Sequence, residues 1–368
     1  MRRPHDDLTP SCFGRRQRAW VTVMVLSMLL PTLSAASSAF QGEFIPFPQV
    51  TLHSYNQDAG AAQQHGSEAM VDFFYTAKYQ DWRLLGEAVV SDDERELERF
   101  TVGRVTPGGS QAWLGRYHTA LGQWNHKFHH GGYLQTTIHR PGIIEFEDDG
   151  GVIPAHATGI TLAGNQELNN RIVGYTLEFG LGPGLGGQGV LIPFNLLDFS
   201  DGEHDLSVTA KLTSYSEDDP FDDSGVFAGH ITIPSQAANI HEVQQTVLGA
   251  YTNYAIGPTL LRASGFYVAN ALKLLGGADK DESFTYAYVE PEYTYNTIWT
   301  YYGRWEKSFG AKDDLYIQQI PSFIINRVLI GARYQMNGSQ ALKFELAHLE
   351  QYGQRFSAME VQWSAALP

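Results

Sequence analysis

Histidines and carboxylates gather in one stretch of this 368-residue chain, and these side chains are the best suited to chemistry. Six of the thirteen histidines lie in 118–156: His118, His126, His129, His130, His139 and His156. Four acidic residues accompany them: Glu145, Glu147, Asp148 and Asp149. If the segment turns helically, His126 could face one ion together with His129 or His130. Imidazole and carboxylate ligands suit zinc or copper, so these three histidines form a candidate metal site.

Other chemistry finds less support in the sequence. No H-E-x-x-H motif or other ligand set of fixed spacing occurs, and no Gly-x-Ser-x-Gly elbow marks a hydrolase. A polar lining of a constricting loop is therefore the rival interpretation of the histidines. The sequence predicts no cofactor, and an enzyme is the least favoured class of function.

The first 39 residues predict a secretory signal peptide. Five arginines precede an apolar run that extends from Trp20 to Leu33, and small residues follow as far as Ala39. This order is typical of an export signal, and the apolar run is shorter than the roughly 20 residues that a membrane-spanning helix needs. The single cysteine, Cys12, lies within the segment, so the mature chain would contain no disulfide and no thiolate metal site.

The remainder of the chain is strongly acidic. Five of the 25 basic and two of the 40 acidic residues lie in 1–39, which leaves a net charge of about −18. Such a charge excludes nucleic acid as a partner, because nucleic acid requires a basic surface. Inside a pore the same charge would favour cations.

Alternation of apolar and polar residues recurs from residue 71 to the end. Leu342, Phe344 and Leu346, for example, alternate with Lys343 and Glu345. Successive side chains of a strand point to opposite faces, so this pattern predicts strands with one apolar and one polar face. The predicted strands are 71–79, 82–91, 98–106, 158–164, 171–181, 204–215, 224–234, 243–257, 259–270, 283–295, 297–309, 323–336, 340–351 and 355–367.

The links between these strands mostly alternate between short and long, as the turns and loops of transmembrane barrels do. Asn337-Gly338 is a strong hairpin signal. The sequence therefore predicts an all-β fold, a transmembrane antiparallel β-barrel of about 14 strands, within a range of about 12–16. The barrel would span 71–368, after a periplasmic N-terminal stretch at 40–70. Two links do not fit, because 79–82 is too short and 216–223 too long for their places. A soluble β-sandwich or propeller is the structural rival.

One excursion, 107–157, is too long for an ordinary loop, and we expect it to constrict the lumen or cap its mouth. Polar strand residues that alternate with lipid-facing ones would also point inward, since lipid penalises Arg or Lys at the midplane by roughly 2–4 kcal/mol. This argument turns Lys211, Glu290, Glu292, Glu306 and Glu360 inward. The predicted lining residues are Arg116, His118, Trp124, His126, His129, His130, Glu145, Glu147, Asp148, Arg262, Arg304, Arg333, Lys343 and Glu345.

Several runs resemble Gram-negative porin-type outer-membrane proteins. They are Gly115-Arg116-Tyr117-His118, Leu121-Gly122-Gln123-Trp124-Asn125, His129-His130-Gly131, Arg140-Pro141 and Gly331-Ala332-Arg333-Tyr334 with the following Ala341–Leu346. The resemblance covers most of 71–368, at the level of pattern. It implies a barrel in the bacterial outer membrane that passes small solutes. Such proteins usually end in Phe or Trp, which the barrel-assembly machinery reads. This chain departs from that pattern, because it ends in Leu367-Pro368.

Besides an enzyme, the sequence leaves two classes of function open. The favoured hypothesis is a porin-like channel for passive diffusion of small solutes, with a preference for cations. The alternative is a closed barrel that binds a metal ion or small ligand through the histidine-rich loop. The expected partners are outer-membrane lipid, small solutes and the assembly machinery. Nothing in the sequence marks a subunit interface, so a homo-oligomer stays open.

Overall fold

The computed structural model describes residues 40–57, 64–92, 95–128, 131–147, 149–197, 202–219, 221–351 and 353–367. The predicted signal peptide lies outside these ranges, as do His129, His130 and Asp148 of the predicted lining. Among the described residues, no helix is long and apolar enough to cross a membrane.

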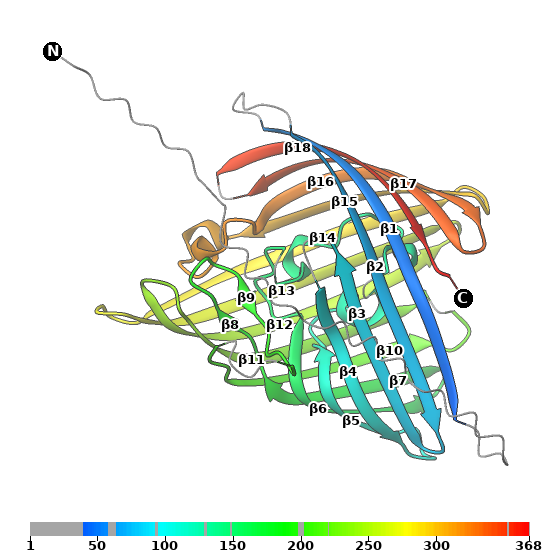
Figure 1. The fold of residues 1–368 in the computed structure, drawn as a ribbon, viewed down its shortest axis with the longest axis horizontal. Coiled ribbons are helices and arrows are strands. Elements are labelled where there is room, and N and C mark those ends of the chain that lie inside the picture. Colours follow the sequence, from blue (N-terminus) through cyan, green and yellow to red (C-terminus); the bar gives the residue numbers. More distant parts are fainter. Residues whose placement is uncertain are drawn as a thin grey trace, which may run out of the picture. The chain divides into compact units, whose positions relative to one another are not determined.

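Sixteen strands of the described chain form one closed barrel in which all neighbours pair antiparallel (Figure 1). In chain order the first seven are β1 (Gln41–Gln57), β2 (Gln64–Tyr79), β3 (Trp82–Ser91), β4 (Arg95–Val105), β5 (Gln111–His118), β6 (His156–Leu168) and β7 (Arg171–Leu181). The others are β10 (Leu206–Ser216), β11 (Asp223–Pro234), β12 (Ile240–Ile256), β13 (Thr259–Leu274), β14 (Lys280–Thr294), β15 (Trp299–Phe309), β16 (Ile324–Asn337), β17 (Gln340–Gln351) and β18 (Gln354–Ala365). A separate two-stranded sheet joins β8 (Gly184–Leu185) to β9 (Leu191–Ile192).

The barrel closes between its first and last strands. Nine residues of β1, from Gln49 to Gln57, pair with Ser364 to Phe356 of β18. Figure 1 shows the blue β1 alongside the red β18. Closure leaves no open sheet edge, which is the condition for placing strands in lipid, where unpaired backbone groups are costly.

The strands place apolar side chains outside and polar ones inside over much of the wall. On β17, Phe344 and Leu346 are 40% and 51% exposed, whereas Lys343 and Glu345 are 0% and 2% exposed. A soluble protein would show the reverse arrangement. The outward apolar face is the arrangement of a barrel surrounded by lipid.

The longest links lie at one end of the barrel, and most of the two-residue links lie at the other. At one end, called the turn end here, the links 80–81, 169–170, 257–258 and 338–339 contain two residues each. At the other, the loop end, the longest links are 119–155, 182–205 and 310–323. The two ends of the barrel domain meet at the turn end, where the Leu367 N–H donates to the Pro46 carbonyl at 3.0 Å.

The predicted fold class is confirmed, and all fourteen predicted strands are present, but the barrel has two more. The stretch 40–70 does not precede the barrel, because β1 and the first residues of β2 lie within it. Pro46 and Pro48 lack the N–H of a strand residue, which hid β1 from the pattern. The short strand β5 was also missed, so the excursion narrows from 107–157 to 119–155. With both strands included, the short 80–81 link falls at the turn end, where it fits.

Three glycines allow β5, β6 and β7 to approach closely below the long loop. Gly115 pairs with Gly159, and Gly159 pairs with Gly180. A Cβ atom on Gly159 would lie 2.1 Å from the Phe179 carbonyl oxygen and 2.4 Å from the Gly180 Cα. Because both neighbours are backbone atoms, they cannot move aside without disturbing the sheet.

We therefore expect Gly159→Ala to lower the free energy of unfolding by about 1–3 kcal/mol, the usual cost of overpacking. Gly265→Ala on β13 is the matched control, because a Cβ there would meet no atom within 4 Å. Its effect should stay within about 0.5 kcal/mol. Urea unfolding in lipid vesicles, followed by tryptophan fluorescence, measures both, and equal effects would contradict the close approach.

Candidate functional site in the barrel lumen

The link 119–155 folds into the interior of the barrel. Of the two predicted placements, inside the lumen or over its mouth, the structure has the first. It leaves from His118, the last residue of β5, and returns to His156, the first of β6. The Thr119 N–H donates to the Ala155 carbonyl at 2.8 Å and joins its two ends. The loop contains three short helical turns: α1 (Trp124–Lys127), η1 (Gly132–Leu134) and η2 (Gly142–Ile144).

One side of the loop forms an apolar core with the wall. Leu121, Trp124 and Ile144 of the loop are at most 2% exposed. The wall contributes inward side chains of β11–β14: Phe227, Ile231, Ile233, Val243, Val247, Tyr251, Phe266, Val268, Leu272, Phe284, Tyr286 and Tyr288. The link 310–323, with η3 (Ala311–Asp313) and η4 (Ile317–Gln319), adds Tyr316, Ile317, Ile320 and Phe323. This half of the lumen is densely packed, so any solute path runs along the other half.

Basic side chains of the wall bind the loop through its backbone. The residues that donate to carbonyl oxygens of 132–140 are Lys343 (to Gly132 and Thr137), Arg333 (to Tyr133 and Gln135), Arg304 (to His139) and Arg327 (to Arg140). They come from three adjacent strands, β15, β16 and β17. Three of these four were predicted to line the lumen, and each of the three binds the loop instead of pointing into open space.

Two of these cations, Arg304 and Arg327, also belong to a buried row of ion pairs that crosses four strands. The pairs are Arg262 with Glu292 (2.7 Å), Arg304 with Glu290 (2.5 Å) and Arg327 with Glu306. All six side chains are at most 9% exposed. Since buried charges are costly unless paired, the row neutralises the wall beneath the loop.

A cavity of about 880 Å³ occupies the opposite side of the loop. It extends from Tyr55, Gln64 and Gln351 near the loop end to Gln49 and Gly132 deeper in the barrel. Seven acidic side chains line it: Glu68, Glu96, Glu98, Glu145, Glu147, Asp149 and Glu360. The basic lining consists of three arginines, Arg95, Arg140 and Arg327, together with His53, His139 and His156. Carboxylates therefore outnumber arginines, which gives the cavity a negative potential.

His139 joins the loop to two wall carboxylates at the edge of this cavity. Its Nδ1 lies 2.6 Å from Glu345 Oε1, and its Nε2 lies 3.4 Å from Glu360 Oε2. Burial alone lowers the pKa of His139, but the charges of Glu360 and Glu345 outweigh it and raise the pKa to about 9. At neutral pH the imidazole is therefore charged and holds the loop against β17 and β18.

This arrangement predicts a loss of stability in mild alkali. The pKa of His139 is above its unfolded value of about 6.5, so its contribution is complete below pH 6.5 and is lost as the pH rises through 9. Between pH 6.5 and pH 9, the free energy of unfolding of the wild-type protein should therefore fall by about 2–3 kcal/mol more than that of His139→Gln. This difference follows from roughly 1.4 kcal/mol for each pH unit. Urea titrations at pH 6 and pH 9.5 measure this difference, and parallel losses in the two proteins would refute it.

The other predicted lining residues fall into several places. Glu145 and Glu147 line the cavity, whereas Trp124 lies in the apolar core. Arg116 is buried at the base of the loop, where it pairs with Glu96. His118 lies beside it at the end of β5. The structure describes the backbone of His126 in α1 but not its side chain, and the predicted metal set with His129 and His130 stays a prediction.

Several contributors to the lumen were missed by sequence reasoning, among them Glu98 and Arg327. The inward position of Arg327 could have been predicted from its neighbour in the sequence, because it alternates with Val328, which is 50% exposed on the outer face. Glu98 has no such signal. The register between β3 and β4 shifts at this point, so that Glu98 and Arg99 are both buried although they are consecutive. Such a bulge redirects one side chain and does not appear in a period-two pattern.

Comparison with known proteins gives a likeness in structure only. Neither a protein-family model nor a curated protein sequence matches the chain. Among solved structures, it is similar to an anion-selective porin from Comamonas acidovorans, with 12% identity and a TM-score of 0.61 over 89% of this chain and 100% of that one. It is similar to the outer-membrane channel DcaP of Acinetobacter baumannii, with 11% identity and a TM-score of 0.58 over 90% and 99% of the chains. It is also similar to OmpF of Salmonella typhi in complex with daunomycin, with 12% identity and a TM-score of 0.55 over 90% and 99%.

These similarities extend over almost the whole barrel, but sequence identities of 11–12% support a likeness of fold alone. The closed antiparallel sheet of sixteen strands, with an apolar outer face and a polar lumen, agrees with them. The chain therefore has the β-barrel fold of the Gram-negative outer-membrane porins.

Proposed function

We propose that this protein is an outer-membrane channel for the passive diffusion of small solutes and that it favours cations. The observation that carries the proposal is the cavity of about 880 Å³ between the inward loop and the wall, lined by seven carboxylates and three arginines. The apolar outer face of the strands supports outer-membrane lipid as its surroundings, and the barrel-assembly machinery stays an expected partner.

The distribution of charge supports the cation preference. Arg304, Arg333 and Lys343 donate to loop carbonyls, and Arg304 also pairs with Glu290, so these cations face protein and not the cavity. The cavity is left with a surplus of carboxylates, which raises the local concentration of cations. The Comamonas porin is anion-selective by its description, so the shared fold alone does not set the sign of selectivity.

The proposal is tested by single-channel recording of the refolded protein in a planar bilayer under a salt gradient. We expect discrete conductance steps with a reversal potential that shows cation selectivity. Heat-modifiable mobility on gels establishes that the sample is folded. Folded protein without steps would overturn the pore and favour a closed barrel that binds a ligand. Steps with anion selectivity would overturn only the cation preference.

A charge reversal in the cavity should weaken that preference. Glu68 lies on β2 with an exposed side chain that lines the cavity. Glu68→Lys replaces a negative by a positive charge beside the solute path, so the cation-to-anion permeability ratio should fall severalfold. Asp218→Lys makes the same change in an exposed link at the turn end and serves as the control. Equal reversal potentials in the two variants would show that this cavity does not determine selectivity.

A further inference from the structure

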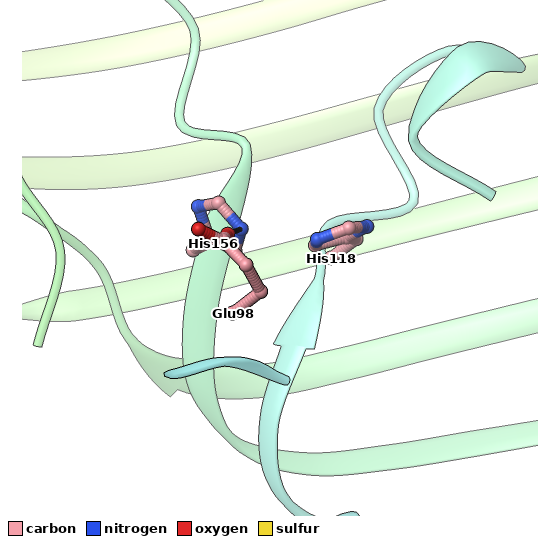
Figure 2. A group of neighbouring side chains, drawn as sticks. All are labelled: Glu98, His118 and His156. Atoms are coloured by element: carbon pink, nitrogen blue, oxygen red, sulfur yellow. Dashed lines mark ion pairs between the residues drawn. The ribbon is translucent and has the colours of Figure 1, made fainter. Parts of the chain in front are cut away.

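Three side chains capable of binding a metal meet at the base of the inward loop. Glu98, His118 and His156 each offer one ligand atom, and these atoms all lie within 4.8 Å of one another (Figure 2). All three residues are at most 4% exposed. Figure 2 shows His118 where β5 ends and His156 where β6 begins, with Glu98 from β4 beside His156.

The sheet itself brings these residues together. His118 and His156 are directly opposite each other in the β5–β6 register, so their side chains share the inner face. Their ring centres lie 4.6 Å apart in an edge-to-face arrangement. Glu98 reaches them because the register shift between β3 and β4 turns its side chain inward. A bulge that re-aims a side chain toward such a group is often a functional feature.

Both histidines also have the outer partners that metal ligands require. His118 Nδ1 lies 3.2 Å from the Asn125 carbonyl oxygen, and His156 Nδ1 lies 2.9 Å from Glu147 Oε2. Glu147 is fixed in turn, because its other oxygen accepts the N–H groups of Ala155 and His156, each at 2.8 Å. Metal-binding histidines usually donate one ring N–H to a carboxylate or backbone carbonyl, which orients the other nitrogen toward the ion.

We propose that Glu98, His118 and His156 form a site for a divalent transition-metal ion such as Zn²⁺, distinct from the loop set His126, His129 and His130. Two imidazoles and one carboxylate are ligands that Zn²⁺ accepts, and a water molecule from the cavity would supply a fourth. Glu98 and His156 line that cavity, which gives the ion a path of entry. A metal site goes beyond the proposed function, because passive diffusion requires no bound metal ion.

The ion would replace a hydrogen-bonded contact that exists without it. His156 Nε2 lies 2.7 Å from Glu98 Oε2, shorter than the separation of roughly 3.3–3.5 Å between two ligands of a tetrahedral Zn²⁺. Binding therefore separates these two atoms slightly and releases the proton of His156. Because His118 and His156 flank the loop, the bound metal would join its two ends across β5 and β6.

The test uses the refolded barrel and the metal alone. Equilibrium dialysis against Zn²⁺ should give one bound ion per chain, and Co²⁺ should give the visible absorption of a nitrogen- and oxygen-coordinated ion. We expect His118→Gln and Glu98→Gln to weaken Zn²⁺ binding by at least roughly 100-fold, and Glu147→Gln by roughly 10–100-fold. His53→Gln, on β1 and lining the same cavity, should bind as the wild type does.

A second measurement needs no variant. In wild-type protein, Zn²⁺ should protect His118 and His156 from diethyl pyrocarbonate, as mapped by mass spectrometry. The absence of saturable binding by folded protein would overturn the site and leave an ion-pair cluster. Protection of other histidines only, or binding lost in a His126/His129/His130→Ala variant but kept in His118→Gln, would also overturn it.

Discussion

Excision of the inward loop should raise single-channel conductance severalfold and weaken cation preference. Residues 120–154 can be replaced by a short Gly-Ser linker, because Thr119 and Ala155 are already hydrogen-bonded neighbours at 2.8 Å. The loop fills the half of the lumen that faces β11–β14 and borders the cavity on the other side. Without it, the sixteen strands still close, since the pairing of β5 with β6 does not involve the excised residues.

The change in selectivity follows from what the excision removes and exposes. Three carboxylates, Glu145, Glu147 and Asp149, leave the cavity with the loop, whereas only two cations, Arg140 and His139, leave with them. At the same time, Arg333 and Lys343 lose the loop carbonyls that they bind and face the widened lumen. A wider pore with fewer carboxylates and more accessible cations discriminates less in favour of cations.

Conductance and reversal potential of the loop-deleted barrel measure both effects. Arg333→Gln and Lys343→Gln in the deleted background should restore part of the cation preference, because they remove the newly exposed charges. If deletion leaves the conductance of a folded barrel unchanged, the solute path does not pass the loop.

The strands and their outward faces were predictable because the signal is local. Alternation places Phe344 and Leu346 outside and Lys343 and Glu345 inside without reference to any other strand. The strand β1 was missed for two reasons, one local and one not. Pro46 and Pro48 interrupt its pattern, and its pairing with β18 joins residues about 300 positions apart, for example Val50 and Trp363.

The candidate site was predictable only in part, for the same physical reason. The alternation predicts Arg304, Arg333 and Lys343 on the inner face of the strands, but it gives no information on the loop carbonyls that each of them binds. Lys343 donates to the Gly132 carbonyl, 211 positions away. The apolar inner face of β11–β14 was missed because residues such as Val226 and Phe227 make both faces of those strands apolar.

The most destabilising single change we expect in the wall is Glu306→Ala. Glu306 is fully buried, and its carboxylate binds Arg327, the Gly142 N–H at 2.7 Å and the Tyr286 hydroxyl at 2.8 Å. It thus neutralises a wall cation and holds η2 of the loop at once. Removal of one partner of a buried ion pair leaves the other charge uncompensated, which costs about 3–5 kcal/mol.

Two further variants separate charge from packing. Glu306→Gln keeps an acceptor and a similar volume, so it should lose less than Glu306→Ala. The double variant Glu306→Ala with Arg327→Met removes both charges and should be more stable than Glu306→Ala alone, because no buried cation is left without a partner.

Asp81→Ala is the control for a simple loss of an ion pair. Asp81 lies 3.5 Å from Arg104, and both side chains are at least half exposed, so its removal should cost no more than about 1 kcal/mol. Urea unfolding in lipid vesicles gives the free energy for each protein. If Glu306→Ala and Asp81→Ala cost the same, the buried row of ion pairs does not hold the loop to the wall. A large loss that the double variant partly reverses would mean that the stability of the lumen depends on charge pairing beneath the loop as well as on its apolar core.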